Sequence, residues 1–234
     1  MSLLSAAALI LSTASSHAVL TITLDDFRDQ LPPSGNPQGD LVVNAGTTSA
    51  SSGVQALTIP SLAGSNRTIS LNYVSGPSNG AASTLSGPGR LSYSAGAGGL
   101  SGGPGTVATL LAEYDLVAPV DFTAGGGDAF SIDIFSRDPV VAAEFVVSVA
   151  STSGTGMAIA PFSLGGTVQS IPFAAFAGVD FTEVTGYSIT INPEPAFDGS
   201  IRLVGVTGAG VPEPSHAVAL LGVLAGAVAR RRRR

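Results

Sequence analysis

Residues 129–135 read Ala-Phe-Ser-Ile-Asp-Ile-Phe and carry the clearest secondary-structure signal in the chain. The apolar residues Phe130, Ile132 and Ile134 alternate with the polar residues Ser131 and Asp133. A period of two places the apolar side chains on one face of a strand and the polar ones on the other. This stretch therefore predicts a β-strand with one buried face.

The same alternation recurs along the chain on both sides of this strand. It is found in residues 19–24, 67–74, 144–149, 186–191 and 201–206. Frequent Gly and Pro separate these segments, and no segment between them shows a helical stripe. Residues 75–105 are rich in Gly, so we expect a mobile surface loop there, interrupted by one short strand at 90–95. The pattern predicts an all-β fold, an antiparallel β-sandwich.

The first 18 residues have the pattern of a secretory signal peptide, with an apolar run followed by Ser16-His17-Ala18. Small residues at the first and third of these positions are typical of a cleavage site. We therefore predict a signal helix over 1–18, export through the Sec machinery, and cleavage between Ala18 and Val19. The alternative is a buried first helix.

The other end of the chain has three parts in a fixed order. Pro212 and Pro214 keep the first part out of any helix, because each lacks a backbone donor. Residues 217–229 carry no charge. A helix over 215–229 would be about 22 Å long at roughly 1.5 Å per residue, shorter than a hydrocarbon core of about 30 Å. Arginines that snorkel could make up the difference. The arginines are Arg230, Arg231, Arg232, Arg233 and Arg234.

This tail resembles the PEP-CTERM sorting signal of Gram-negative bacteria that produce exopolysaccharide. The matching features are Val211-Pro212-Glu213-Pro214, the apolar run and the arginine block. The resemblance implies a transient anchor in the inner membrane and removal of the tail near Pro212-Glu213-Pro214 by an exosortase. The alternative is a permanent tail anchor. We thus predict three parts: signal peptide 1–18, β-sandwich 19–208, and sorting tail 209–234 with a single transmembrane helix.

The predicted sandwich lacks most of the side chains that carry catalysis. Its segment, residues 19–210, contains no His, Cys, Lys or Trp. These absences exclude a Ser-His-Asp triad, a zinc site of the common kind and a Schiff-base lysine. The segment has 5 Arg and 15 acidic residues, and its formal charge is −10. Nucleic acid is therefore not an expected partner, since binding phosphates requires cations.

Carboxylates are the one source of acid–base chemistry that remains. A glycosidase uses two of them, and the candidates are Glu113, Asp115, Glu144 and Glu183. Glu113 and Asp115 are two residues apart and would share one face of a strand. We interpret them as solvated charges at a sheet edge and predict that the protein is not an enzyme. A carboxylate-dependent glycosidase or polysaccharide lyase is the alternative.

A second resemblance concerns the middle of the chain. The segment Ile171-Pro172-Phe173-Ala174-Ala175-Phe176, with Val179-Asp180-Phe181 and Val184 after it, is similar to the late strands of galactose-binding-like jelly rolls. Leu24-Asp25-Asp26-Phe27 is similar to their first strand. Carbohydrate-binding modules of this shape carry such segments, and the resemblance implies a jelly-roll-like sandwich for this chain. Such modules commonly bind sugar on a Trp, which this chain lacks.

The resemblance also implies two kinds of site residue. The related modules often carry a structural calcium ion, for which Asp25, Asp26 and Asp198 are the candidates, since calcium takes carboxylate ligands. The alternative is that these are solvated acids in turns, and otherwise no cofactor is expected. A sugar stacks on an exposed aromatic ring, for which Tyr114, near a strand end between two acids, is the candidate; the alternative is a partly buried residue at a sheet edge. We expect Tyr73, Tyr93 and Tyr187 to be core residues.

Together these features predict an exported, non-catalytic protein of the cell surface or extracellular matrix. Its expected partners are the Sec machinery, an exosortase, the inner membrane before processing, and exopolysaccharide, as in a biofilm matrix.

Overall fold

The computed structural model describes residues 18–29, 41–87, 89–95, 105–138 and 141–209. Within it, Leu20–Gly208 form one compact unit. Residues 1–17 and 210–234, which carry most of the predicted signal peptide and sorting tail, lie outside the described residues. Among the residues that the structure does describe, no helix is long and apolar enough to cross a membrane.

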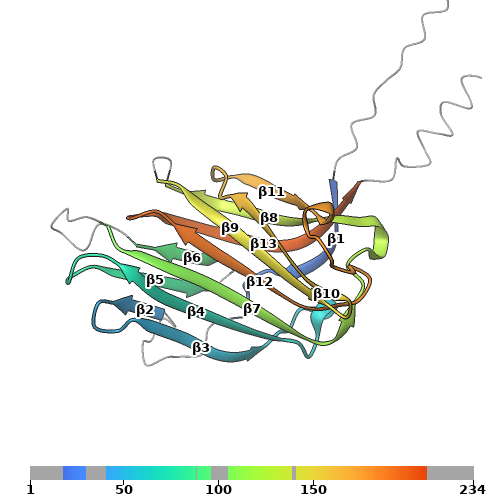
Figure 1. Ribbon diagram of the computed structural model, residues 1–234, viewed down its shortest axis with the longest axis horizontal. Helices are drawn as coiled ribbons and strands as arrows, with labels where there is room; N and C mark the ends of the chain where they lie inside the picture. The colour runs from blue at the N-terminus through green and yellow to red at the C-terminus, as the bar shows by residue number, and fades with distance from the viewer. Residues whose placement is uncertain (1–17, 30–40, 88, 96–104, 139–140, 210–234) are drawn as a thin grey trace, which may run out of the picture. The chain divides into compact units, whose positions relative to one another are not determined.

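Two sheets form the fold, and within each sheet neighbouring strands along its order pair antiparallel (Figure 1). The six-stranded sheet has the order β10-β9-β12-β7-β4-β3. Its strands are β3 (Ser49–Ala56), β4 (Asn66–Ser75), β7 (Val107–Val120), β9 (Ala143–Ser151), β10 (Gly154–Pro161) and β12 (Val184–Pro193).

The seven-stranded sheet has the order β11-β8-β13-β6-β5-β2, and β1 also pairs with β13. Its strands are β1 (Ala18–Asp25), β2 (Leu41–Asn44), β5 (Ala81–Ser86), β6 (Leu91–Ser94), β8 (Gly127–Arg137), β11 (Thr167–Pro172) and β13 (Asp198–Ala209). Apart from three hairpins and the step from β1 to β2, which lie in the same sheet, the chain switches sheets between successive strands, as in a jelly roll. The predicted sandwich is confirmed.

The described residues contain no α-helix, and their helical elements are three short 3-10 turns. These are η1 (Pro60–Leu62), η2 (Ala124–Gly126) and η3 (Phe173–Ala175). All the strands predicted from alternation are present, and the short strand at 90–95 is β6. The segment 75–105 is less of a loop than expected, because β5 lies in it as well. Its residues pair with β2 on one side and β6 on the other.

The core lies between the sheets and is built by the inward faces of the central strands. Phe130, Ile132 and Ile134 of β8 are fully buried, as the alternation predicts. Phe145 and Val147 of β9 are fully buried from the other sheet. At roughly 25 cal/mol per Å² of apolar surface removed from water, such side chains supply the main stabilisation of the sandwich.

Candidate functional site

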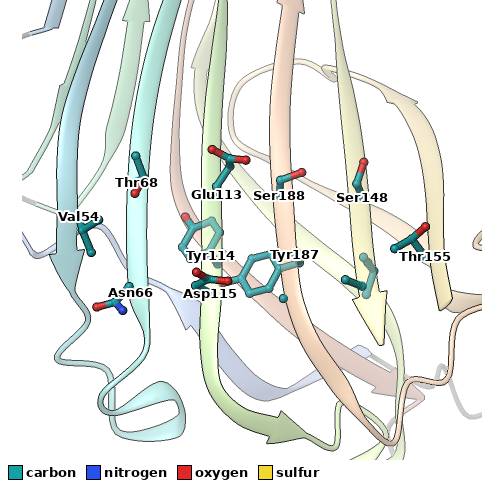
Figure 2. A pocket seen from close by; sticks show the side chains of 13 residues that line it. Val54, Asn66, Thr68, Glu113, Tyr114, Asp115, Ser148, Thr155, Tyr187 and Ser188 are labelled. Carbon is teal, nitrogen blue, oxygen red and sulfur yellow. The ribbon is translucent and has the colours of Figure 1, made fainter. Parts of the chain in front are cut away.

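The principal candidate site is a groove on the outer face of the six-stranded sheet. Its volume is about 440 Å³, and its side chains come from all six strands. Figure 2 shows the labelled side chains standing in rows across neighbouring strands. The residues that line it are Val54, Asn66, Thr68, Glu113, Tyr114, Asp115, Ser148, Val149, Ala150, Thr155, Gly186, Tyr187 and Ser188.

Strand register explains how residues far apart in the sequence meet in this groove. Thr68 lies opposite Glu113, and Glu113 lies opposite Ser188. Ser188 in turn pairs with Ser148 of β9. With strands about 4.8 Å apart, this row across four strands is about 14 Å long. The row is a ladder of hydroxyls with one carboxylate at its centre.

A second row lies beside the first, one pleat along each strand. Asn66 pairs with Asp115, and Asp115 pairs with Gly186. Gly186 pairs with Ala150, which pairs with Thr155 at the β10 edge. Gly186 has no side chain, and a Cβ there would come within 2.9 Å of the Tyr114 carbonyl oxygen. The floor is therefore low at this point, with Asp115 on one side and Thr155 on the other.

The predicted pairing of Glu113 and Asp115 on one strand face is confirmed, since both are exposed and line the groove. The expectation that they lie at a sheet edge is wrong, because β7 is paired on both sides, with β4 and β12. Glu144 lies at the start of β9, outside the groove lining. Glu183 lies in the connection before β12 and accepts a hydrogen bond from the Thr152 hydroxyl. The structure thus brings together two of the four carboxylates.

The expectation of an exposed ring at Tyr114 is wrong. Tyr114 lies in the middle of β7, not near its end, and only 3% of the residue is exposed. Its ring stacks on that of Tyr187, with 4.2 Å between centroids, under the groove floor. Glu113 and Asp115 point outward, so period two sends the residue between them inward. Tyr93 and Tyr187 are buried as expected, and Tyr73 is half-buried.

A buried polar network lies behind Tyr114. The Arg67 guanidinium donates to the Asp25 carboxylate at 2.6 Å, and both side chains are fully buried. The Tyr114 hydroxyl donates to the same Asp25 oxygen at 2.7 Å. Arg67 also donates to the Gln55 amide oxygen and to the Asp29 carbonyl oxygen. Burial raises the pKa of Tyr114 well above its usual value, and the adjacent Asp25 raises it further.

The three aspartates proposed as calcium ligands do not come together. Asp25 is engaged by Arg67, and Asp26 forms an ion pair with Arg28. The terminal strands are adjacent as expected, but β1 meets β13 near Val206, whose carbonyl accepts from Thr21. Asp198 starts β13, about 26 Å away along the strand at roughly 3.3 Å per residue. The described residues include no cluster of three or more His, Asp or Glu side chains able to hold a metal ion.

Sequence reasoning missed most of the groove. The outward positions of Thr68 and Ser188 could be predicted from alternation, since their neighbours Ile69 and Ile189 are buried. Their alignment with Glu113 depends on register, which has no local signal in the sequence. Arg67 shares the inward face of β4 with Ile69, so its burial was also predictable from alternation.

No protein-family model and no curated protein sequence matches this chain. Solved structures resemble it weakly. A family 11 carbohydrate-binding module from Clostridium thermocellum, solved with a mixed-linked tetrasaccharide, has 17% identity and a TM-score of 0.35, covering 84% of this chain and all of the module. An agarase has 9% identity and a TM-score of 0.38; the match covers 61% of this chain, which spans only 22% of the agarase. At these scores the similarities identify neither a family nor a ligand.

Proposed function

We propose that the protein is an exported, non-catalytic polysaccharide-binding protein whose binding surface is the groove of the six-stranded sheet. The observation that carries this is the row of outward hydroxyl and carboxylate groups Thr68, Glu113, Ser188 and Ser148, aligned by register across four strands, with Asn66 and Asp115 in the row beside it. Sugar hydroxyls both donate and accept hydrogen bonds, and these side chains offer both functions. The row of about 14 Å suits a short stretch of an extended polymer.

The groove has the opposite character from an aromatic sugar platform. Both tyrosines among its lining residues are buried below its floor, so stacking contributes nothing there. Hydrogen bonds exchanged with water give modest net stabilisation, typically about 1 kcal/mol each. We therefore expect a single groove to bind weakly. The protein would be retained on a long polymer through repeated contacts along that polymer.

The arrangement of the carboxylates disfavours catalysis. A glycosidase places its two carboxyl groups on either side of the scissile bond. Glu113 and Asp115 project side by side from one strand, and both are exposed to solvent. A non-catalytic role is therefore proposed in preference to the hydrolase alternative.

Affinity electrophoresis of the full-length product through gels containing the producing cell's exopolysaccharide, β-glucan or galactan tests this proposal. At least one polymer should retard the protein. Glu113→Gln or Asp115→Asn should lower the affinity derived from this retardation about tenfold. Asp128→Asn is the matched control, because Asp128 is an exposed carboxylate on the other sheet.

Three outcomes count against the proposal. The first is that no polymer retards the protein, and the second is an equal loss of affinity in the groove variants and in Asp128→Asn. The third is the release of new reducing ends by the unmodified protein but not by Glu113→Gln, which would establish the hydrolase instead.

A further inference from the structure

The arginines of the sandwich are distributed unevenly. Arg67 is buried in its ion pair with Asp25, and Arg28 is exposed in the loop after β1. The other three, Arg90, Arg137 and Arg202, lie on or beside the outer face of the seven-stranded sheet, opposite the groove. A domain with 15 acidic residues and 5 arginines thus places most of its cations on one face.

Two of these guanidiniums are held by one aromatic ring. Arg90 lies 4.3 Å from the centroid of the Phe135 ring, and Arg202 lies 5.9 Å from it. Phe135 is 43% exposed, although Phe130 in the same strand is fully buried. Guanidiniums attract the negative face of an aromatic ring. Phe135 therefore orders two cationic side chains that would otherwise be mobile at the surface.

Both guanidiniums keep donors for a ligand. Arg202 uses its Nε to bind Asp133 at 2.6 Å, which leaves its terminal nitrogens, on a half-exposed side chain, without a hydrogen-bond partner among the described residues. Arg90 forms no ion pair with any carboxylate among the described residues. A guanidinium presents a planar fork of donors that matches a carboxylate or sulfate group.

A hollow of about 390 Å³ has Arg90 and Arg137 in its lining, together with the hydroxyls of Ser92, Ser94, Ser136 and Ser200. Ser200 of β13 pairs with Ser92 of β6 and with Ser136 of β8, so the three form one row. Ser136 and Ser200 share a hydrogen bond of 2.6 Å, and Ser94 stands at the rim. Hydroxyls beside an arginine pair suit a sugar that carries an acidic group.

The charge near the hollow limits the kind of polymer. Asp138 and Asp198 also line it, and Asp133 is paired with Arg202. Together with the net charge of the domain, these carboxylates repel a densely charged polyanion. A chain with widely spaced acidic groups, each reaching one arginine pair, meets less repulsion.

We propose that Arg90, Phe135 and Arg202, with the adjoining serine hollow, bind an acidic sugar residue of a polysaccharide. The guanidiniums receive its anionic group, and Ser92, Ser136 and Ser200 bind its hydroxyls. This site is separate from the groove of the proposed function. A domain with both sites would join two polysaccharide chains across the thickness of the sandwich.

The test uses affinity electrophoresis with hyaluronan, which carries one carboxylate per two sugars, with dextran sulfate and with neutral dextran. Variants are made in the full-length gene. Arg90→Gln and Arg202→Gln should each weaken binding to hyaluronan about tenfold, the size expected for one lost charge-assisted hydrogen bond. Arg28→Gln, an exposed arginine elsewhere, is the charge-matched control and should change binding less than about twofold. Phe135→Leu should weaken binding while both charges remain.

Hyaluronan should retard the protein more than dextran sulfate does, because the charges of dextran sulfate are dense; retardation by dextran sulfate alone would contradict the argument from charge spacing. The proposal fails if neither anionic polymer binds, if neutral dextran binds equally, or if Arg28→Gln matches the loss. It also fails if Arg90→Gln abolishes self-association in sedimentation equilibrium without changing glycan binding, because the face then binds a second copy. Groove variants at Glu113 and Asp115 should leave hyaluronan binding unchanged, so the two proposals can fail separately.

Discussion

Arg67 is the largest fully buried side chain among the described residues, and it occupies a core position of β4. Its guanidinium joins β1 to the six-stranded sheet, because Asp25 ends β1 and Gln55 lies in β3. Charges in an apolar interior are stable only as a pair with further hydrogen bonds. The network therefore fixes how β1 meets the strands below the groove.

Arg67→Met should destabilise the protein by about 3–5 kcal/mol, because it leaves the Asp25 carboxylate buried without its counter-ion. Urea unfolding measures the change. Arg28→Met is the control: Arg28 also pairs with an aspartate, but its side chain is 81% exposed. If the two variants unfold at the same urea concentration, Arg67 contributes no more than a surface charge.

The buried tyrosines predict a loss of stability in alkali. Burial raises the pKa of Tyr93 from 10.0 to about 12, and burial raises the pKa of Tyr187 well above 10.0. A pKa that is higher in the folded state means that the native protein holds the proton longer. The stabilisation is complete below pH 10 and is lost as the pH rises towards 12. Tyrosinate absorbance should show Tyr93, Tyr114 and Tyr187 ionising together with unfolding; their ionisation in the intact fold at pH 10 would contradict this.

At the scale of elements, the connection between β11 and β12 forms an aromatic cluster. Phe173 and Phe181 stack with their centroids 3.8 Å apart, and Phe176 packs on Phe181 at 5.6 Å. All three contact Phe130 of β8 at 5.6 to 6.3 Å. The segment thus packs on β8 through aromatic pairs, each typically worth about 0.5–1.5 kcal/mol beyond the area it buries.

Phe181→Ala should lower the free energy of unfolding by about 3–5 kcal/mol, because it removes a buried ring from its cluster with Phe130, Phe173 and Phe176 and leaves a cavity. Phe135→Ala is the matched control, since its ring is partly exposed. Thermal unfolding of both variants gives the comparison. Equal melting temperatures would show that the aromatic cluster does not stabilise the sandwich.

Strands differ in how well the sequence predicts them, and their place in the sheet explains why. β8, β9, β12 and β13 carry alternating β-branched and aromatic residues. The strands without a clear pattern include all four at the ends of the sheet paths, β11, β2, β10 and β3. β3 reads SASSGVQA and β10 reads GTGMAIAP. Such segments become strands through pairing with a neighbour, a tertiary effect that local composition does not report.

The candidate site was predictable only in part for the same reason. Period two alone places Glu113 and Asp115 outward, and applied consistently it also places Tyr114 and Arg67 inward. Which residues stand beside Glu113 depends on the pairing of β7 with β4 and β12. The joining of Arg90 to Phe135 likewise depends on the packing of two segments more than 40 residues apart.

At the scale of the whole molecule, the two outer faces of the sandwich differ in charge. Among described residues, the ionisable side chains on the groove face are Glu113, Asp115 and Glu144. The opposite face carries Arg90, Arg137 and Arg202, with Asp133, Asp138 and Asp198 beside them. Under the two proposals made above, the groove would bind a neutral chain and the arginine face a chain with widely spaced acidic groups.

The sorting tail gives the last prediction, for residues that lie outside those the structure describes. An arginine at mid-membrane costs about 2.5–3.5 kcal/mol on insertion scales, so the block Arg230–Arg234 should stay on the cytoplasmic side. The apolar run would then hold Pro212-Glu213-Pro214 near the outer face of the inner membrane, extended because proline cannot join the helix. A membrane-embedded exosortase could cut it there.

Replacing the five arginines with serines should therefore prevent processing, while the sandwich, which includes none of them, still folds. The mass of the released protein reports the outcome, compared between the parent strain and a strain without its exosortase. Release at the mass of the trimmed chain from the parent alone agrees with sorting. If the released protein retains Arg234 in both strains, the tail is not a processing signal. Removal of the tail also removes its five arginines, so the trimmed sandwich would leave the membrane with its full negative charge. Arg90 and Arg202 would then be the cations that it offers to a matrix ligand.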